Sequence, residues 1–138
     1  MAAHHPATVN PEQLPWLPLA PKIGVKVLRV DRETGRFSVM IRAEAGGVLP
    51  RHRHIESAEI LVLKGKGTHK QTGYFEAGNY ISEAKGALHD ALHFDEEVEL
   101  LMVCDGPSAF LADDGSVQHV MDIGMLDYLA ASNAAASA

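Results

Sequence analysis

Apolar and polar residues alternate through much of the chain between residues 23 and 121, which is the period-two pattern of strands that bury one face. The first run is Ile23, Val25 and Val27, after which the alternation changes phase at Leu28. This change of phase predicts a β-bulge. Many short strands separated by glycine-rich turns predict an all-β sandwich or barrel. The pattern places further strands at residues 37–42, 60–63, 68–71, 79–82, 98–103, 109–111 and 117–121.

The two ends of the chain differ from this middle part. Four prolines between Pro11 and Pro21 exclude a regular helix there. We therefore expect an extended arm at 1–22, whose apolar cluster around Trp16 packs on the body or on a neighbouring subunit. A helical pattern occurs only from 122 to 131, and the Ala-Ser tail after it is expected to fray. This predicts a barrel over 23–121 and a C-terminal helix and tail over 122–138.

Composition places the 138-residue chain among ordinary single globular domains, with 46% apolar and 22% charged residues. A net charge of −6 without a basic run argues against a nucleic-acid partner. The chain shows no signal-peptide pattern and no apolar run long enough for a membrane span, so we expect a cytoplasmic protein with no membrane partner. The lone Cys104 follows an apolar strand and is expected to be a packed thiol.

Candidate chemistry starts with the sequence Arg51-His52-Arg53-His54. In a strand, residues two apart point to the same side, so His52 and His54 would project together. Two imidazoles on one barrel wall can occupy adjacent corners of a metal's coordination sphere. The alternative is a polar surface stretch, in which the two arginines and the histidines attract an anion.

A second segment favours the metal site. Gly78 feeds a predicted strand, Gly86 makes a tight bend, and His89 follows three residues after that bend. Such a bend can direct His89 back into the barrel. His52, His54 and His89 would then bind one ion.

These two segments carry a resemblance to the cupin superfamily. Residues 46–59 read G-x5-H-x-H-x4-E, and residues 78–89 read G-x5-A-x-G-x2-H, in the order of the two cupin motifs. Ala84 stands where proline is usual, and His93 stands where asparagine is usual. The resemblance implies a double-stranded β-helix, or jelly-roll barrel, here with an extended N-terminal arm and a short C-terminal helix.

A narrower resemblance follows from the order of the segments at 14–17, 52–54, 63–65, 86–89 and 110–115. The chain is similar to the acetylacetone-cleaving (β-diketone) dioxygenases and, more loosely, to the 2,4′-dihydroxyacetophenone dioxygenases. In both, iron(II) held by three histidines activates O2, and a C–C bond beside a carbonyl group is cut. The resemblance implies iron(II) here, with zinc or nickel as alternatives, bound by His52, His54 and His89.

The same resemblance implies roles for other polar residues. An acid six residues before the last ligand falls on Glu83, which could orient a ligand or take a proton from the substrate. A basic group near the substrate falls on Lys70, where the family has arginine. Glu59 is either a fourth ligand or a residue at the strand edge, paired with Arg51 or Arg53.

The remaining histidines are less informative. His93 could face the cavity or the surface, whereas His69 and His119 lie in polar surroundings and are expected to have no role. Apolar residues near the metal should form either the pocket or an ordinary core. The candidates are Phe37, Met40, Ile60, Val62, Leu101 and Phe110.

Three neutral imidazoles leave a divalent ion with its full charge, which favours an anionic enolate of a carbonyl compound as the ligand. The sequence-based hypothesis is therefore a non-haem iron(II) dioxygenase whose partners are a small carbonyl substrate and O2. By resemblance, we expect a homodimer or a homotetramer. Two alternatives remain open, namely a non-catalytic zinc-binding sensor or regulatory module and a cupin isomerase that acts on sugars.

Overall fold

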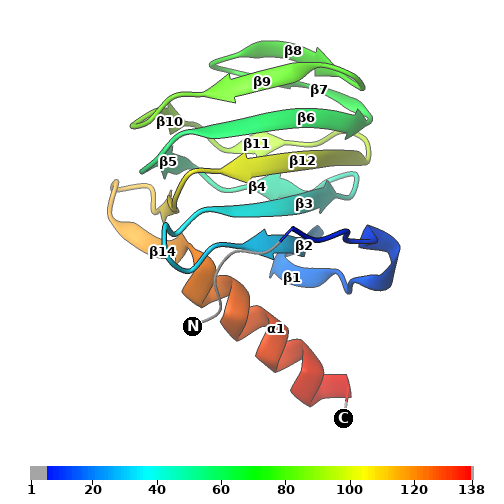
Figure 1. Cartoon of the computed structure of the whole chain (residues 1–138). Coiled ribbons are helices and arrows are strands. Elements are labelled where there is room, and N and C mark those ends of the chain that lie inside the picture. Colours follow the sequence, from blue (N-terminus) through cyan, green and yellow to red (C-terminus); the bar gives the residue numbers. More distant parts are fainter. Residues whose placement is uncertain (1–5, 138) are drawn as a thin grey trace.

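The computed structural model describes residues 6–137, which form two layers of antiparallel strands and one α-helix (Figure 1). The larger sheet is shown in Figure 1 from β9 at the top to β1 at the bottom. In spatial order its strands are β1 (Leu17–Ala20), β2 (Ile23–Val30), β3 (Phe37–Ala43), β12 (Val98–Cys104), β6 (Ala58–Lys64) and β9 (Tyr80–Glu83).

The second layer is made of shorter strands that lie behind this sheet in Figure 1. Four of them form a sheet in the order β10 (Leu88–His89), β5 (His52–His54), β13 (Ser108–Leu111) and β14 (Val117–Met121). Two further pairs are β11 (Leu92–His93) with β4 (Val48–Leu49), and β7 (Lys66–His69) with β8 (Gly73–Glu76). The all-β prediction with one C-terminal helix is thereby confirmed.

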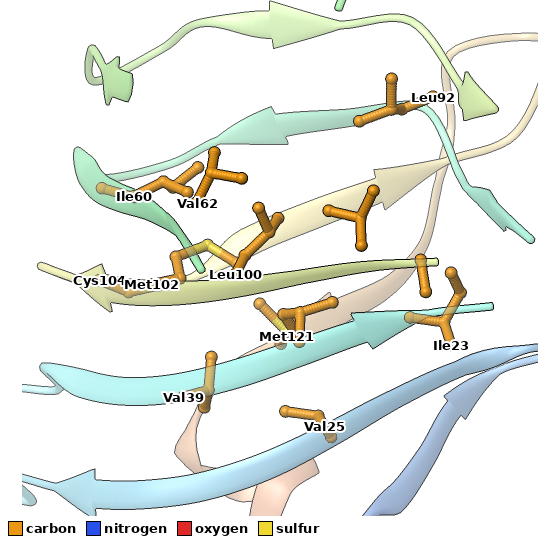
Figure 2. Packing of buried hydrophobic residues seen from close by; sticks show 14 of the residues in the cluster. Ile23, Val25, Val39, Ile60, Val62, Leu92, Leu100, Met102, Cys104 and Met121 are labelled. Carbon is orange, nitrogen blue, oxygen red and sulfur yellow. The ribbon is translucent and has the colours of Figure 1, made fainter. Parts of the chain in front are cut away.

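The alternation of residues along the strands explains which side chains form the core. Along β3, Phe37, Val39 and Ile41 are buried, while Ser38 and Met40 between them are only partly buried. The β2–β3 register shifts between Val27 and Arg29, which confirms the bulge predicted near Leu28. Figure 2 shows the inward side chains between the strands, among them Val25, Val39, Val62, Leu100 and Met121.

Two of the expected pocket residues lie on the other face. Met40 is two residues from Arg42, and Leu101 is two residues from Glu99, so each shares the outer face of its strand with a charged residue. Both side chains are therefore only half-buried. The larger sheet instead turns Ile41, Leu100 and Met102 inward.

Gly65 closes the turn between β6 and β7. Its φ is +82°, a left-handed conformation that residues with a Cβ rarely adopt. A Cβ at this position would also lie 2.2 Å from the carbonyl oxygen of Glu97, inside any contact distance. The positive φ and the close approach of the Glu97 carbonyl oxygen therefore both require glycine at this position. The turn that Gly65 forms determines where β7 begins.

The helix α1 (Ile123–Ser137) starts after β14, with Asp122 as its N-cap: the Asp122 carboxylate accepts a hydrogen bond from Met125 N at 2.8 Å. Leu126 packs in the core, and Arg32 binds both carboxylate oxygens of Asp127 at 2.7 and 2.9 Å. The tail expected to fray continues this helix as far as Ser137, since alanine favours helix even where little is buried. The helix α1 is not long and apolar enough to cross a membrane.

The N-terminal segment joins the larger sheet at Leu17, which lies inside the range expected for the arm. β1 pairs with β2, and the charged groups of Lys26 and Arg42 lie 4.7 and 4.3 Å from the centre of the Trp16 ring. The described part of the arm thus packs on its own barrel, and residues 1–5 lie outside the described residues.

Candidate metal centre

Three histidines converge on one point between the layers. His52 and His54 are on the same face of β5, and His89 on β10 is the register partner of His52. Their side chains are buried, with exposed fractions of 6, 3 and 2%. The ring centres are 5.0 to 5.2 Å apart, which is nearly an equilateral triangle.

This triangle has the size that a metal ion requires. The ligand nitrogens of the three histidines all lie within 4.8 Å of one another. An ion about 2.1 Å from each nitrogen is about 3.2 Å from each ring centre, so rings at the observed spacing would be separated by about 100° around it. The predicted convergence of His52, His54 and His89 is therefore what the structure shows.

The bend at Gly86 brings His89 into position. Gly86 has a φ of +83°, and its N–H donates to the carbonyl oxygen of His54 at 2.6 Å. In return, His54 N–H donates to the carbonyl oxygen of Ala87 at 2.9 Å. These bonds fix β10 beside β5, so the backbone of one ligand strand positions the ligand of the other.

Hydrogen bonds orient two of the rings. His52 Nδ1 is 2.9 Å from the carbonyl oxygen of Pro50, which can only accept, so Nδ1 carries the proton and Nε2 keeps a lone pair. His54 Nδ1 is 3.2 Å from the hydroxyl group of Ser108, a residue that is only 3% exposed. The hydroxyl oxygen can accept a hydrogen bond from a proton on Nδ1. An imidazole held in this way by its second nitrogen is typical of metal ligands.

His89 gives the strongest sign that an ion belongs here. Both of its ring nitrogens are buried, and Nδ1 has no hydrogen-bond partner in the described range 6–137. Its Nε2 is in close contact with Oε2 of Glu83, a carboxylate that is 3% exposed. An unsatisfied buried polar atom costs about 1–3 kcal/mol. A metal ion bound to the ring nitrogen of His89 that Glu83 does not use would remove this cost. The residues present therefore fit a divalent metal.

Burial also keeps the ligands in their metal-binding form. Desolvation lowers the pKa of His52 to about 4 and lowers the pKa of His54 as well, so both are neutral at pH 7. Burial alone would raise the pKa of Glu83, but contact with His89 and the charges of the nearby histidines hold it below its usual value. The centre thus has two neutral imidazoles, those of His52 and His54, and one ionised carboxylate, that of Glu83.

His52 and His54 line a largely apolar chamber of about 50 Å³. Since one water needs about 10–15 Å³ by this measure, the chamber accepts a few water-sized groups. Ile60 and Phe110, two of the expected pocket residues, line it, whereas Phe37 and Val62 belong to the core. Among residues 6–137, no lysine, arginine or tyrosine lines the chamber. Its polar lining consists of His52, His54, His69, Glu83 and Ser108.

Three other expected site residues do not meet the histidines. Glu59 points out of β6 and accepts hydrogen bonds from Tyr80 and Ser82, rather than pairing with an arginine. His93 is exposed at the end of β11. Lys70 is exposed in the turn after β7, with its Nζ 3.7 Å from Asp90.

His69, from which we expected no role, lies in the chamber wall. It is only 6% exposed, and its ring meets the His89 ring edge-on with centres 4.4 Å apart. A ring nitrogen of His69, a carboxylate oxygen of Glu83 and a ring nitrogen of His89 form a second group of potential ligand atoms, which lie within 4.8 Å of one another. Desolvation lowers the pKa of His69.

Comparison with known proteins agrees with this geometry. The profile of the family described as the ChrR cupin-like domain matches residues 4–109. An acetylacetone-cleaving enzyme of Acinetobacter johnsonii is 29% identical over 120 residues, which are 80% of this chain and 77% of that protein. The resemblance to the cupins and, distantly, to acetylacetone-cleaving enzymes is thereby confirmed.

Solved structures show the same fold. A cupin-like protein of Ralstonia eutropha JMP134, described as RmlC-like, superposes with a TM-score of 0.82 at 22% identity, covering 94% of this chain and 88% of that one. The acetylacetone dioxygenase of Acinetobacter johnsonii superposes with a TM-score of 0.80 at 22% identity, covering 94 and 92%. The expected cupin fold is confirmed.

Proposed function

The chain belongs to the ChrR cupin-like domain family, and on that premise we propose that it is an iron(II)- and O2-dependent dioxygenase. Its substrate would be a β-diketone or a related carbonyl compound, in which one C–C bond is cut. The observation that carries the proposal is the triangle of buried histidines, two of which line an apolar chamber. The similarity to an acetylacetone-cleaving enzyme supports it.

The reaction balances without an external reductant. A β-diketone, R–CO–CH2–CO–R′, and one O2 give a carboxylic acid and an α-dicarbonyl compound, and both oxygen atoms of O2 enter the products. Iron(II) held by His52, His54 and His89 would keep its full charge of +2, and it would supply the Lewis acidity for an enolate and the redox chemistry for O2.

The residues of the chain have separate tasks in this reaction. His52, His54 and His89 hold the metal. Glu83 orients His89 and, because it is ionised, can accept the proton that a diketone loses on becoming an enolate. The apolar walls of the chamber exclude water from the bound carbonyl compound. Lys70 has no part in this proposal because its ammonium group is exposed outside the chamber.

The two alternative functions make different demands on the site. A sugar isomerase of the cupin type is expected to carry more arginine, lysine and tyrosine inside its barrel, and among the described residues none lines this chamber. A zinc-binding regulatory module would need only the three histidines. Metal identity and turnover separate it from the enzyme.

The test is O2 uptake by iron(II)-loaded protein on addition of pentane-2,4-dione, with acetate and methylglyoxal identified by NMR. We expect turnover in the wild type, loss on chelation, and recovery with iron(II). His54→Ala should abolish metal binding and turnover, while the matched control His119→Ala, at an exposed position of β14, should keep both. Tightly held zinc in protein from its natural host, together with no O2 uptake by the iron-loaded form across a series of diketones, would contradict the enzyme and favour the regulatory module.

A further inference from the structure

We propose that His69 is a positioning residue of the chamber, whose Nε2–H donates a hydrogen bond to an oxygen atom of the metal-bound ligand. This inference deepens the proposed function and rests on it for the metal site. It narrows the class of molecule that the metal site would bind to compounds with an oxygen atom that lies next to the metal and accepts a hydrogen bond. It also separates His69 from the proposed metal ligands, although the His69 ring centre, at 4.4 Å, is closer to that of His89 than the ring centres of His52 and His54 are.

The β7–β8 hairpin sets the direction of His69. Gly67 pairs with Phe75 and His69 pairs with Gly73, so Gly67 and His69 are on the same face of β7. A Cβ on Gly67 would lie 2.7 Å from the Phe75 ring, which is itself buried in the core and lines the chamber. The face of β7 that carries Gly67 is therefore the inner one, and His69 follows it into the chamber.

A backbone hydrogen bond fixes the tautomer of His69. The N–H of Gln71 donates to His69 Nδ1 at 3.2 Å, so Nδ1 offers its lone pair to the backbone. A neutral imidazole then carries its proton on Nε2. This arrangement is opposite to that of His52, where Nδ1 faces a carbonyl acceptor and the lone pair remains on Nε2.

The tautomer decides between two ways of holding an ion. By position alone, His69, Glu83 and His89 could form a set of two histidines and a carboxylate, the commoner triad of iron oxygenases. However, His69 has no free lone pair, because its Nδ1 is used by Gln71 and its Nε2 is protonated. His69 can therefore donate to a ligand beside the metal, but it is not itself a metal ligand.

The other polar groups of the chamber have different tasks. The Ser108 hydroxyl lies against His54, and Glu83 lies against His89. For His69 Nε2, the structure records no protein acceptor within residues 6–137. The acceptor that completes this donor is an oxygen of the bound molecule, such as a carbonyl or enolate oxygen.

The experiment measures the affinity of Co(II)-loaded protein for acetohydroxamate, a small chelator with two oxygen donors, from the visible spectrum of the cobalt ion. His69→Leu removes the donor at similar size, and His69→Gln keeps an N–H near the position of Nε2. We expect both variants to bind one Co(II) per chain, as the wild type does. The Kd for acetohydroxamate should rise about 10-fold in His69→Leu and stay within about 3-fold of the wild type in His69→Gln.

Two controls separate this role from a structural one. Imidazole binds the metal through nitrogen and offers no acceptor oxygen, so its Kd should not change in His69→Leu. His119→Leu, at an exposed position, should leave both affinities unchanged. A rise in both Kd values would show a general disturbance of the site and overturn the proposal.

Other outcomes are equally decisive. An unchanged affinity of His69→Leu for acetohydroxamate would refute the donor role, and loss of Co(II) from both His69 variants would make His69 a ligand. If the leucine variant does not fold, ¹⁵N NMR of wild-type zinc-loaded protein tests the tautomer, and a protonated or metal-bound Nδ1 on His69 contradicts it. Because acetohydroxamate binds without turnover, failure of the diketone reaction would leave this comparison intact.

Discussion

The metal-free protein should lose stability in mild acid because of His52. Burial lowers the pKa of this side chain from an ordinary value of 6.5 to about 4 in the folded state. Between these two pH values the unfolded chain binds a proton that the folded protein does not bind. Stability therefore falls as the pH is lowered from 6.5 to 4 and is fully present above 6.5.

The size of the effect follows from this interval. At about 1.4 kcal/mol per pH unit, the difference between pH 6.5 and pH 4 amounts to about 3 kcal/mol. The side chain is 6% exposed, so solvent screening takes little from this value. Glu83 acts in the same direction: burial opposes ionisation, but His89 and the other histidines lower its pKa, so its contribution is also lost as the pH falls.

The assay is urea unfolding of metal-free protein, kept in chelator and followed by circular dichroism at several pH values from 7.5 to 4.5. We expect the free energy of unfolding of the wild type to decline over this range, and His52→Gln to show a decline smaller by up to about 3 kcal/mol. The exposed His119→Gln should behave like the wild type. Equal slopes for the wild type and His52→Gln would refute the argument that burial keeps His52 neutral.

Three further predictions concern single positions. Gly65→Ala should destabilise the protein by more than about 2 kcal/mol in urea unfolding, because the new Cβ would meet a backbone carbonyl oxygen at 2.2 Å. The control Gly73→Ala should cost only about 1 kcal/mol, because Gly73 also has a positive φ, of +94°, but has open space around it. Ser108→Ala should raise the Kd for zinc about 10-fold in a chelator competition, since it removes the partner of His54 Nδ1. Cys104 should resist iodoacetamide at pH 8 until the protein is unfolded, because burial raises the pKa of its thiol to about 12.

The convergence of His52, His54 and His89 could be predicted from the sequence because their placement is local. His52 and His54 share a face through the two-residue period of a strand, and the glycine bend before His89 is set by backbone geometry. The same two-residue period could have corrected the predicted list of pocket residues. Met40 is two residues from Ser38 and from Arg42, so it had to share their outer face.

His69 was missed because its strand carries no apolar signal. The inward position before it is Gly67, which has no side chain, and its neighbours Thr68 and Lys70 are polar. The apolar side chain that fills this part of the wall, Phe75, comes from the partner strand. Only the register of the hairpin reveals that His69 faces inward, and that register depends on a turn whose geometry the sequence does not determine.

The role of each histidine depends on a still finer feature. His69 and His52 cannot be told apart by burial or by their contact with His89, since both are 6% exposed and both rings lie close to the His89 ring. The difference lies in what meets Nδ1, which is the carbonyl oxygen of Pro50 in one case and the N–H of Gln71 in the other. An acceptor at Nδ1 leaves a lone pair for a metal, whereas a donor at Nδ1 leaves a proton for a ligand. One backbone contact thus assigns two similar side chains to opposite tasks, whereas interatomic distances alone would count four equivalent histidines.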